Sequence, residues 1–194
     1  MAELGATEDT AALVPGDPAA LRSTAETYRR YAVMLGDAAA GLGRVATPEG
    51  WSGAAADGFR ASFGIEPRRW QDAATAFTDA AGAVDGHASA LEIARGRAGE
   101  AIARWREAQA VSTTARAEYD RAAATAPVAT PFTDPGEAGR ADALTVLTGA
   151  RQDVRDSGDR SAAVVTAACA AAPAAPGLWG QVADGAAAVA SEAG

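Results

Sequence analysis

The segment Trp51-Ser52-Gly53-Ala54-Ala55-Ala56-Asp57-Gly58-Phe59 decides the fold of this chain, because it marks a reversal between two helices. Pro48 and Gly50 end the preceding helix, and Gly53 permits a sharp turn. The small alanines that follow let a second helix approach the first closely, and Trp51 can lie over the ends of both. We therefore predict a helical hairpin whose turn motif is Trp51 and Gly53. If the indole of Trp51 is buried there, its replacement by alanine should destabilise the hairpin by about 3 kcal/mol.

The helix before the turn carries a heptad stripe. Asp17 and Pro18 supply the N-cap and the first helical residue that commonly begin a helix. The apolar residues that follow recur every seven positions, at Leu21, Tyr28, Leu35 and Leu42. Residues 1–16, which precede this helix, are interpreted as a flexible leader.

The helix after the turn carries a longer stripe of the same spacing. Its members are Phe63, Trp70, Phe77, Val84, Leu91, Ala98 and Trp105, with Phe59 before them. Pro67 should kink this helix or start it afresh near Glu66, because proline removes a backbone donor. At helical spacing the aromatic members are interpreted as packing residues between helices, in preference to a row that stacks a ligand. A partner helix lying along this helix would bury the stripe.

The remainder of the chain is predicted to fold back along the long helix. A loop rich in proline and threonine covers residues 125–136, and Asp134-Pro135 repeats the helix-start signal. A third helix is expected over about residues 136–172, and a short helical tail that packs back on the long helix is expected over 178–190. We predict an all-α fold of long antiparallel hairpins sharing an extended central helix, with 17–125 as the hairpin and 126–194 as the loop, third helix and tail.

Composition and charge exclude several classes of function. The formal net charge is −8, and every basic residue is arginine. A chain without a basic stripe is a poor candidate for binding nucleic acid or an anionic membrane surface. No run of 18 strongly apolar residues occurs, and residues 1–12 lack the pattern of a classical signal peptide. We expect no nucleic-acid partner and no stable membrane insertion.

The sequence contains few residues suited to catalysis or metal binding. His87 is the only histidine and Cys169 the only cysteine, so neither a catalytic triad nor a set of close metal ligands can be assembled. We interpret His87 as a helix-surface residue and Cys169 as a small buried residue. We therefore predict no catalytic residue, no cofactor site and no metal site. An enzyme or toxin with a pocket around His87 or Cys169 is a rival hypothesis.

The Trp-x-Gly turn between two amphipathic helices resembles the WXG-type proteins that bacterial type VII (ESX-like) systems export. The resemblance covers about residues 14–110 and rests on Leu21, Leu35, Trp51, Gly53, Ala55, Ala56, Phe59 and Trp70. Residues around Arg104-Trp105-Arg106 resemble the N-terminal targeting region of large polymorphic toxins. The usual export signal is a tyrosine followed four residues later by Asp or Glu, but Tyr119 is followed at that distance by Ala123. Tyr119 and Asp120 are the residues nearest to a degenerate form of this signal.

The resemblance implies a non-catalytic targeting module of a secreted effector, which is cytoplasmic before export. Its implied partners are another helical hairpin of the WXG type, a second copy of itself, or the type VII secretion ATPase. The residues expected to pack the hairpin or to meet a partner are Leu21, Tyr28, Leu35, Leu42, Phe59, Phe63, Trp70, Phe77, Leu91 and Trp105. The alternative is a cytoplasmic helical adaptor or chaperone-like protein, which a gene neighbourhood without a toxin domain or secretion ATPase would favour.

Overall fold

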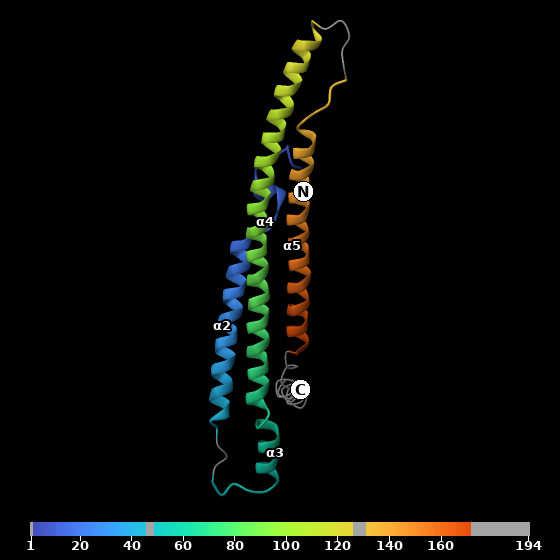
Figure 1. Cartoon of the computed structure of the whole chain (residues 1–194). Helices are drawn as coiled ribbons and strands as arrows, with labels where there is room; N and C mark the ends of the chain where they lie inside the picture. Colours follow the sequence, from blue (N-terminus) through green and yellow to red (C-terminus); the bar gives the residue numbers. More distant parts are fainter. Residues whose placement is uncertain (1, 46–48, 126–130, 172–194) are drawn as a thin grey trace, which may run out of the picture. The chain divides into compact units, whose positions relative to one another are not determined.

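The computed structural model describes residues 2–45, 49–125 and 131–171. Five helices cover most of these residues: α1 (Thr10–Leu13), α2 (Pro18–Gly43), α3 (Ala54–Phe63), α4 (Glu66–Ala123) and α5 (Glu137–Ala171) (Figure 1). The described ranges contain no β-strand, only an isolated bridge between Leu4 and Thr7. The prediction of an all-α fold is confirmed.

The predicted helix starts are present. Oδ1 of Asp17 accepts hydrogen bonds from the amides of Ala19 and Ala20, both at 3.0 Å, which caps α2. The expected break near Glu66 is confirmed, because α3 ends at Phe63 and α4 begins at Glu66. From there α4 continues for 58 residues and runs through Gly86 without interruption.

The chain divides into two compact units, which are described separately: unit 1 (Met1–Thr24 with Ala83–Ala162) and unit 2 (Ala25–Gly82 with Ala163–Gly194). In unit 1, α4 and α5 lie antiparallel, since Arg97 pairs with Asp153 while the hydroxyl of Ser161 donates to the carbonyl oxygen of Ala83 at 2.8 Å. The seam between the two helices is lined by small residues, which are Ala94, Ala98 and Ala101 on α4 and Ala143 and Ala150 on α5, all at most 1% exposed.

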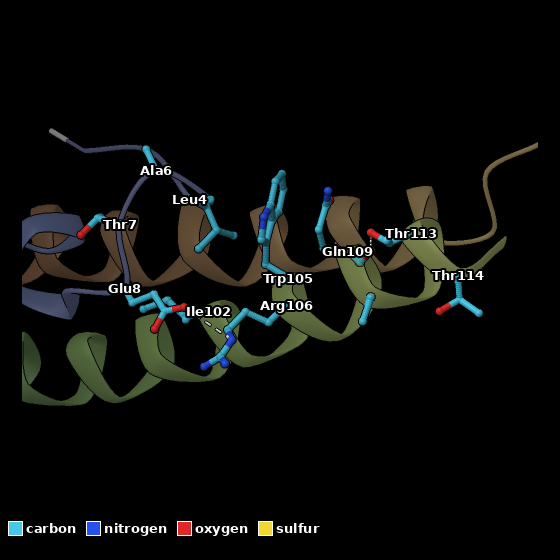
Figure 2. A pocket seen from close by; sticks show the side chains of 12 residues that line it. Leu4, Ala6, Thr7, Glu8, Ile102, Trp105, Arg106, Gln109, Thr113 and Thr114 are labelled. Carbon is cyan, nitrogen blue, oxygen red and sulfur yellow. Dashed lines mark hydrogen bonds and ion pairs between the residues drawn. The ribbon is translucent and has the colours of Figure 1, made fainter. Parts of the chain in front are cut away.

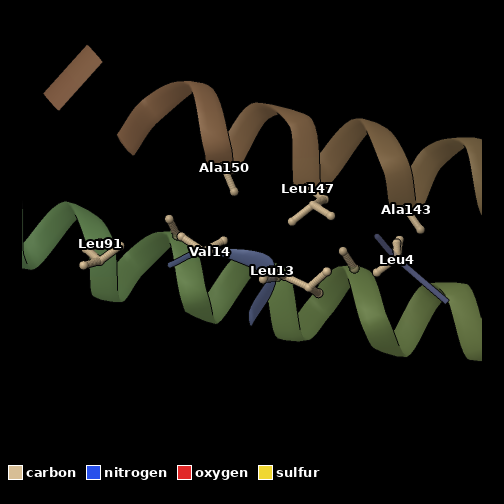
Figure 3. Close-up of a cluster of buried hydrophobic side chains, with 10 residues drawn as sticks. Leu4, Leu13, Val14, Leu91, Ala143, Leu147 and Ala150 are labelled. Carbon is tan, nitrogen blue, oxygen red and sulfur yellow. The ribbon is translucent and has the colours of Figure 1, made fainter. Parts of the chain in front are cut away.

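Residues 2–16, which we name the strap, fill this seam. Leu4, Leu13 and Val14 of the strap belong to the same buried cluster as Leu91 and Leu147 (Figure 3). Leu13 is 0% exposed and Val14 is 1% exposed. We expected a flexible leader over residues 1–16, whereas the structure packs this segment into the core. The physical reason is that alanine side chains are too short to fill the space between α4 and α5, so leucine and valine from the strap fill it.

In unit 2 the later part of α2 packs against the first part of α4. The ring of Phe77 contacts Tyr28 at a centroid distance of 5.7 Å and Tyr31 at 5.5 Å. Alanines again form the buried positions, and they are Ala25, Ala39, Ala56, Ala74, Ala76, Ala80 and Ala81. Unit 2 is therefore held by aromatic contacts over a seam of small residues.

Some expectations fall outside the described residues. These are the helical tail over 178–190 and part of the proline-rich loop, since the structure describes neither 126–130 nor 172–194. Among the helices that are described, none combines the length and the apolar character needed to cross a membrane.

Candidate functional site

The turn motif is built around α3. Gly53 precedes α3 with a φ of 96°, a left-handed conformation that glycine adopts without strain. The indole of Trp51 lies 5.4 Å from the ring of Phe59, which stacks on Phe63 at 4.9 Å. Arg60 donates a hydrogen bond to the carbonyl oxygen of Trp51 at 2.8 Å. Trp51 thus begins a row of three rings along α3 and is 37% exposed, which is more than its predicted position over two helices implies.

The predicted packing residues divide between the two units. In unit 1, Leu91 is 1% exposed, and Leu21 and Trp105 pack against the same cluster. In unit 2, the residues that are half-buried are Tyr28, Leu35, Leu42, Phe59, Phe63, Trp70 and Phe77. Their burial is consistent with packing inside the chain, so most of the two stripes is already covered. Partner recognition by these residues stays a prediction.

The strap is held by two arginines, one from each wall of the seam. Arg95 of α4 donates to the carbonyl oxygens of Val14 at 3.2 Å and Gly16 at 2.7 Å. Arg151 of α5 donates to those of Leu13 at 3.0 Å and Ala2 at 2.6 Å. Because each bond ends on a main-chain carbonyl, the two guanidinium groups bind the strap through its backbone.

Two glycines fit the strap to its walls. Gly5 has a φ of 91°, and a Cβ built on it would lie 2.8 Å from Nε1 of Trp105. Gly16 has a φ of 142°, and its Cβ would lie 2.5 Å from Cδ2 of Leu91. Both positions therefore exclude a side chain by contact as well as by backbone conformation.

An open cavity lies beside the strap on α4. It has a volume of about 650 Å³ and is lined by Leu4–Glu8 of the strap and by α4 residues from Ile102 to Thr114, with Trp105 between the two (Figure 2). Arg106 on its rim forms an ion pair with Glu8 at 3.5 Å, and both side chains are about two-thirds exposed. The cavity thus combines an indole ring, threonine and glutamine side chains, and an exposed ion pair.

Tyr119, the residue nearest to an export signal, lies close to the end of α4. Its ring meets that of Phe132 edge to face at 5.3 Å. The guanidinium of Arg116 lies 5.6 Å from the ring of Tyr119 and 5.1 Å from that of Phe132, and it also pairs with Asp120 at 3.1 Å. The structure therefore brings Tyr119 and Asp120 together around one arginine, which the sequence did not predict.

A polar cluster holds the start of α5 to α4 in the same unit. The Ser112 hydroxyl donates to Oδ1 of Asp134 at 2.6 Å, Arg140 pairs with Oδ2, and the amide of Gly136 donates to Oδ1 at 2.9 Å. The hydrogen bond from Ser112, then those from Arg140 and Gly136, lower the pKa of Asp134 from 3.8 to about 2. Asp134 therefore stays charged over almost the whole pH range.

The residues considered for catalysis, His87 and Cys169, belong to different units and are described separately. In unit 1, Nδ1 of His87 lies 3.4 Å from Oγ of Ser157, a residue that is 7% exposed. In unit 2, Cys169 is exposed, so its prediction as a buried residue is wrong. The stretch around it is rich in alanine, and alanine on every face gives no periodicity from which to orient a helix. Within the described ranges, no three His, Cys, Asp or Glu residues gather as metal ligands.

The described residues form a protein of long helices. Its distinctive features are the packed strap, the row of three aromatic rings at the turn motif, and exposed helix faces. The family model described as "Putative T7SS secretion signal domain" matches residues 2–176. The match covers most of the 194 residues, so the chain belongs to this family of type VII secretion signal domains. Comparisons with curated proteins and with solved structures gave no match.

Proposed function

We propose that this chain is the targeting module of a type VII secretion substrate, placed at the N-terminal end of a secreted effector, and that it acts by binding partners without catalysis. The family match over residues 2–176 is the observation that carries the proposal. Export would proceed from the cytoplasm by the type VII route. The partners would be a helical hairpin of the WXG type, or a second copy, together with the secretion ATPase.

The exposed apolar residues of α2 in unit 2 form the face that best fits a helical partner. Val33 and Met34 are 63% and 65% exposed, and Tyr31 beside them is 48% exposed. Neighbouring apolar residues on one helix are what a facing helix covers in a helix-in-groove contact. Most of the predicted stripe is instead half-buried within the chain, which leaves this face as the proposed docking surface.

Tyr119 and Asp120 are the proposed export signal in degenerate form. Their shared contact with Arg116 supports treating them as one recognition element, because a single binding surface could meet the ring and the carboxylate together. Substitution of Tyr119 by alanine should then lower export while leaving folding intact. Substitution of Arg121, an exposed residue in the last turn of α4, serves as the matched control.

Export is the direct test. The chain is expressed in a host with a working type VII secretion ATPase and in the same host with the ATPase inactivated, and the culture medium is assayed. Appearance in the medium only with the working ATPase is the expected result. Retention in both strains, even with candidate helical partners co-expressed, would overturn the targeting proposal and favour a cytoplasmic adaptor.

The docking face is tested separately. The double variant Val33→Glu with Met34→Glu should lose co-purification with the helical partner, because two charges would be buried in the contact. Ile93→Glu is the matched control, since Ile93 is 66% exposed but lies on α4 in unit 1. Equal loss of binding in both variants would argue against a specific role for α2.

A further inference from the structure

We propose that the seam between α4 and α5 in unit 1 is a peptide-binding groove. It takes an apolar segment that is folded back on itself, and it binds that segment by its main-chain carbonyls. Residues 2–16 occupy the groove in the folded chain, and this occupant can be exchanged. The proposal is independent of the secretion role. It assigns a site and a class of ligand, namely a peptide with apolar anchors and with glycine at two fixed positions.

The groove recognises backbone in the way that peptide-binding sites do. Arg95 and Arg151 stand on opposite walls, and each donates to two carbonyl oxygens of the strap, at distances of 2.6 to 3.2 Å. Both arginines are half-buried, which strengthens a charge-assisted hydrogen bond compared with one in water. Such bonds do not depend on the side chains of the bound segment, so they supply affinity for any segment that folds to present its carbonyl oxygens at the same points.

The walls require an occupant and also select it. The facing alanines leave a gap that the larger side chains of Leu4, Leu13 and Val14 fill beside Leu91 and Leu147. At the two points where the strap touches Trp105 and Leu91, any side chain on the bound peptide would come within 3 Å of the wall. The groove therefore favours apolar anchors together with glycine at the positions of residues 5 and 16.

The strap has a few hydrogen bonds of its own, from the amide of Ala2 to the carbonyl oxygen of Ala12 at 3.4 Å, from that of Ala6 to the carbonyl oxygen of Glu3 at 3.2 Å and from that of Asp9 to Oγ1 of Thr7 at 3.0 Å. Its one helix, α1, has four residues, capped by the Asp9 carboxylate through a 2.8 Å bond to the amide of Ala11. An isolated helix of this length is not stable in water, so the groove orders the strap. In this respect the strap resembles a bound peptide that is covalently attached to its binding site.

The cavity beside Trp105 offers a competing peptide an entry point. It continues along α4 past the strap to Thr113 and Thr114 and stays open in the presence of the strap (Figure 2). A longer peptide could make first contact there and then displace residues 4–8. The ion pair between Glu8 and Arg106 at its rim is exposed and contributes little to holding the strap.

The test converts the strap into a separate ligand within the folded chain. A recognition sequence for a site-specific protease is inserted between Gly16 and Asp17 of the full chain. The protein is folded and cleaved, and the two fragments are followed by gel filtration and mass spectrometry. We expect fragment 1–16 to co-elute with the rest and to exchange with an excess of labelled synthetic peptide of the same sequence. Helical circular dichroism should stay unchanged throughout.

Variants make the result specific. Arg95→Gln with Arg151→Gln should weaken retention of the fragment at least tenfold, whereas Arg106→Gln should change it less than twofold. A peptide carrying Gly16→Val should fail to compete. The proposal is overturned if the fragment never exchanges, or if the valine peptide competes as well as the native one.

Discussion

Nη2 of Arg151 donates a hydrogen bond to the carbonyl oxygen of Ala2 at 2.6 Å, across 149 positions of sequence. The same guanidinium binds the carbonyl oxygen of Leu13, so one side chain of α5 holds two parts of the strap that its fold brings together. This arrangement makes unit 1 dependent on residues at the very start of the described chain. It also predicts which arginine on α5 matters most.

Arg151→Gln should lower the free energy of unfolding by about 2–3 kcal/mol, because two hydrogen bonds from a charged donor are lost and two carbonyl groups lose their partner. Urea denaturation followed by circular dichroism measures the change. Arg155→Gln on the same helix is the control and should stay within about 0.5 kcal/mol, since Arg155 is exposed. A value for Arg151→Gln as small as that of the control would mean that the strap is not held by this contact.

Two glycines with opposite environments give a second prediction. Gly5→Ala should destabilise the chain by about 2 kcal/mol, because its Cβ would collide with Trp105 and its φ of 91° disfavours alanine. Gly96→Ala should instead stabilise α4 by up to about 1 kcal/mol, since nothing lies within 4 Å of that Cβ and alanine is the better helix former. Melting temperatures that move in the same direction for both variants would contradict this picture.

The contrast between the helices and the strap shows what the sequence could predict. Asp17-Pro18, Pro67 and Asp134-Pro135 announce helix starts, because capping and proline geometry are local properties. The position of the strap depends on carbonyl oxygens, which every residue possesses, and on arginines far away in sequence. Only Gly5 and Gly16 indicate that another residue comes close to the backbone of the strap, and a glycine alone does not show which residue that is. The cluster around Arg116 escaped prediction for the same reason, since Phe132 lies beyond the end of α4.

Trp51→Ala should destabilise the chain by about 1 kcal/mol, less than the 3 kcal/mol expected for a fully buried indole. The reason is that Trp51 is 37% exposed and that its indole packs against a single described ring, that of Phe59. Denaturant unfolding of Trp51→Ala and Trp51→Phe measures this difference, and the phenylalanine variant should retain most of the stacking. A loss of 3 kcal/mol or more in the alanine variant would restore the buried position predicted from sequence.

His87→Ala should leave both partner binding and export unchanged. Nδ1 of the ring lies 3.4 Å from Oγ of Ser157, a weak contact, and among the described residues no three His, Cys, Asp or Glu side chains gather as metal ligands. Export of the variant is compared with wild type at equal expression. If export or binding falls while the melting temperature holds, a functional site at His87 must be reconsidered.

The stability of the folded chain should depend on pH through Asp134. Its folded pKa of about 2 lies below the ordinary 3.8, so the charged form is the one that the folded state stabilises. The contribution is therefore fully present above about pH 4 and is lost as pH falls from 3.8 through 2. Asp134→Asn, which keeps the shape but removes the charge, should be less stable than wild type at pH 7. The difference should shrink steadily between pH 4 and pH 2, as measured by urea unfolding at each pH. Asp142→Asn, at an exposed position of α5, should show no such convergence. A gap between Asp134→Asn and wild type that persists unchanged down to pH 2 would rule out the cluster with Ser112 and Arg140 as its origin.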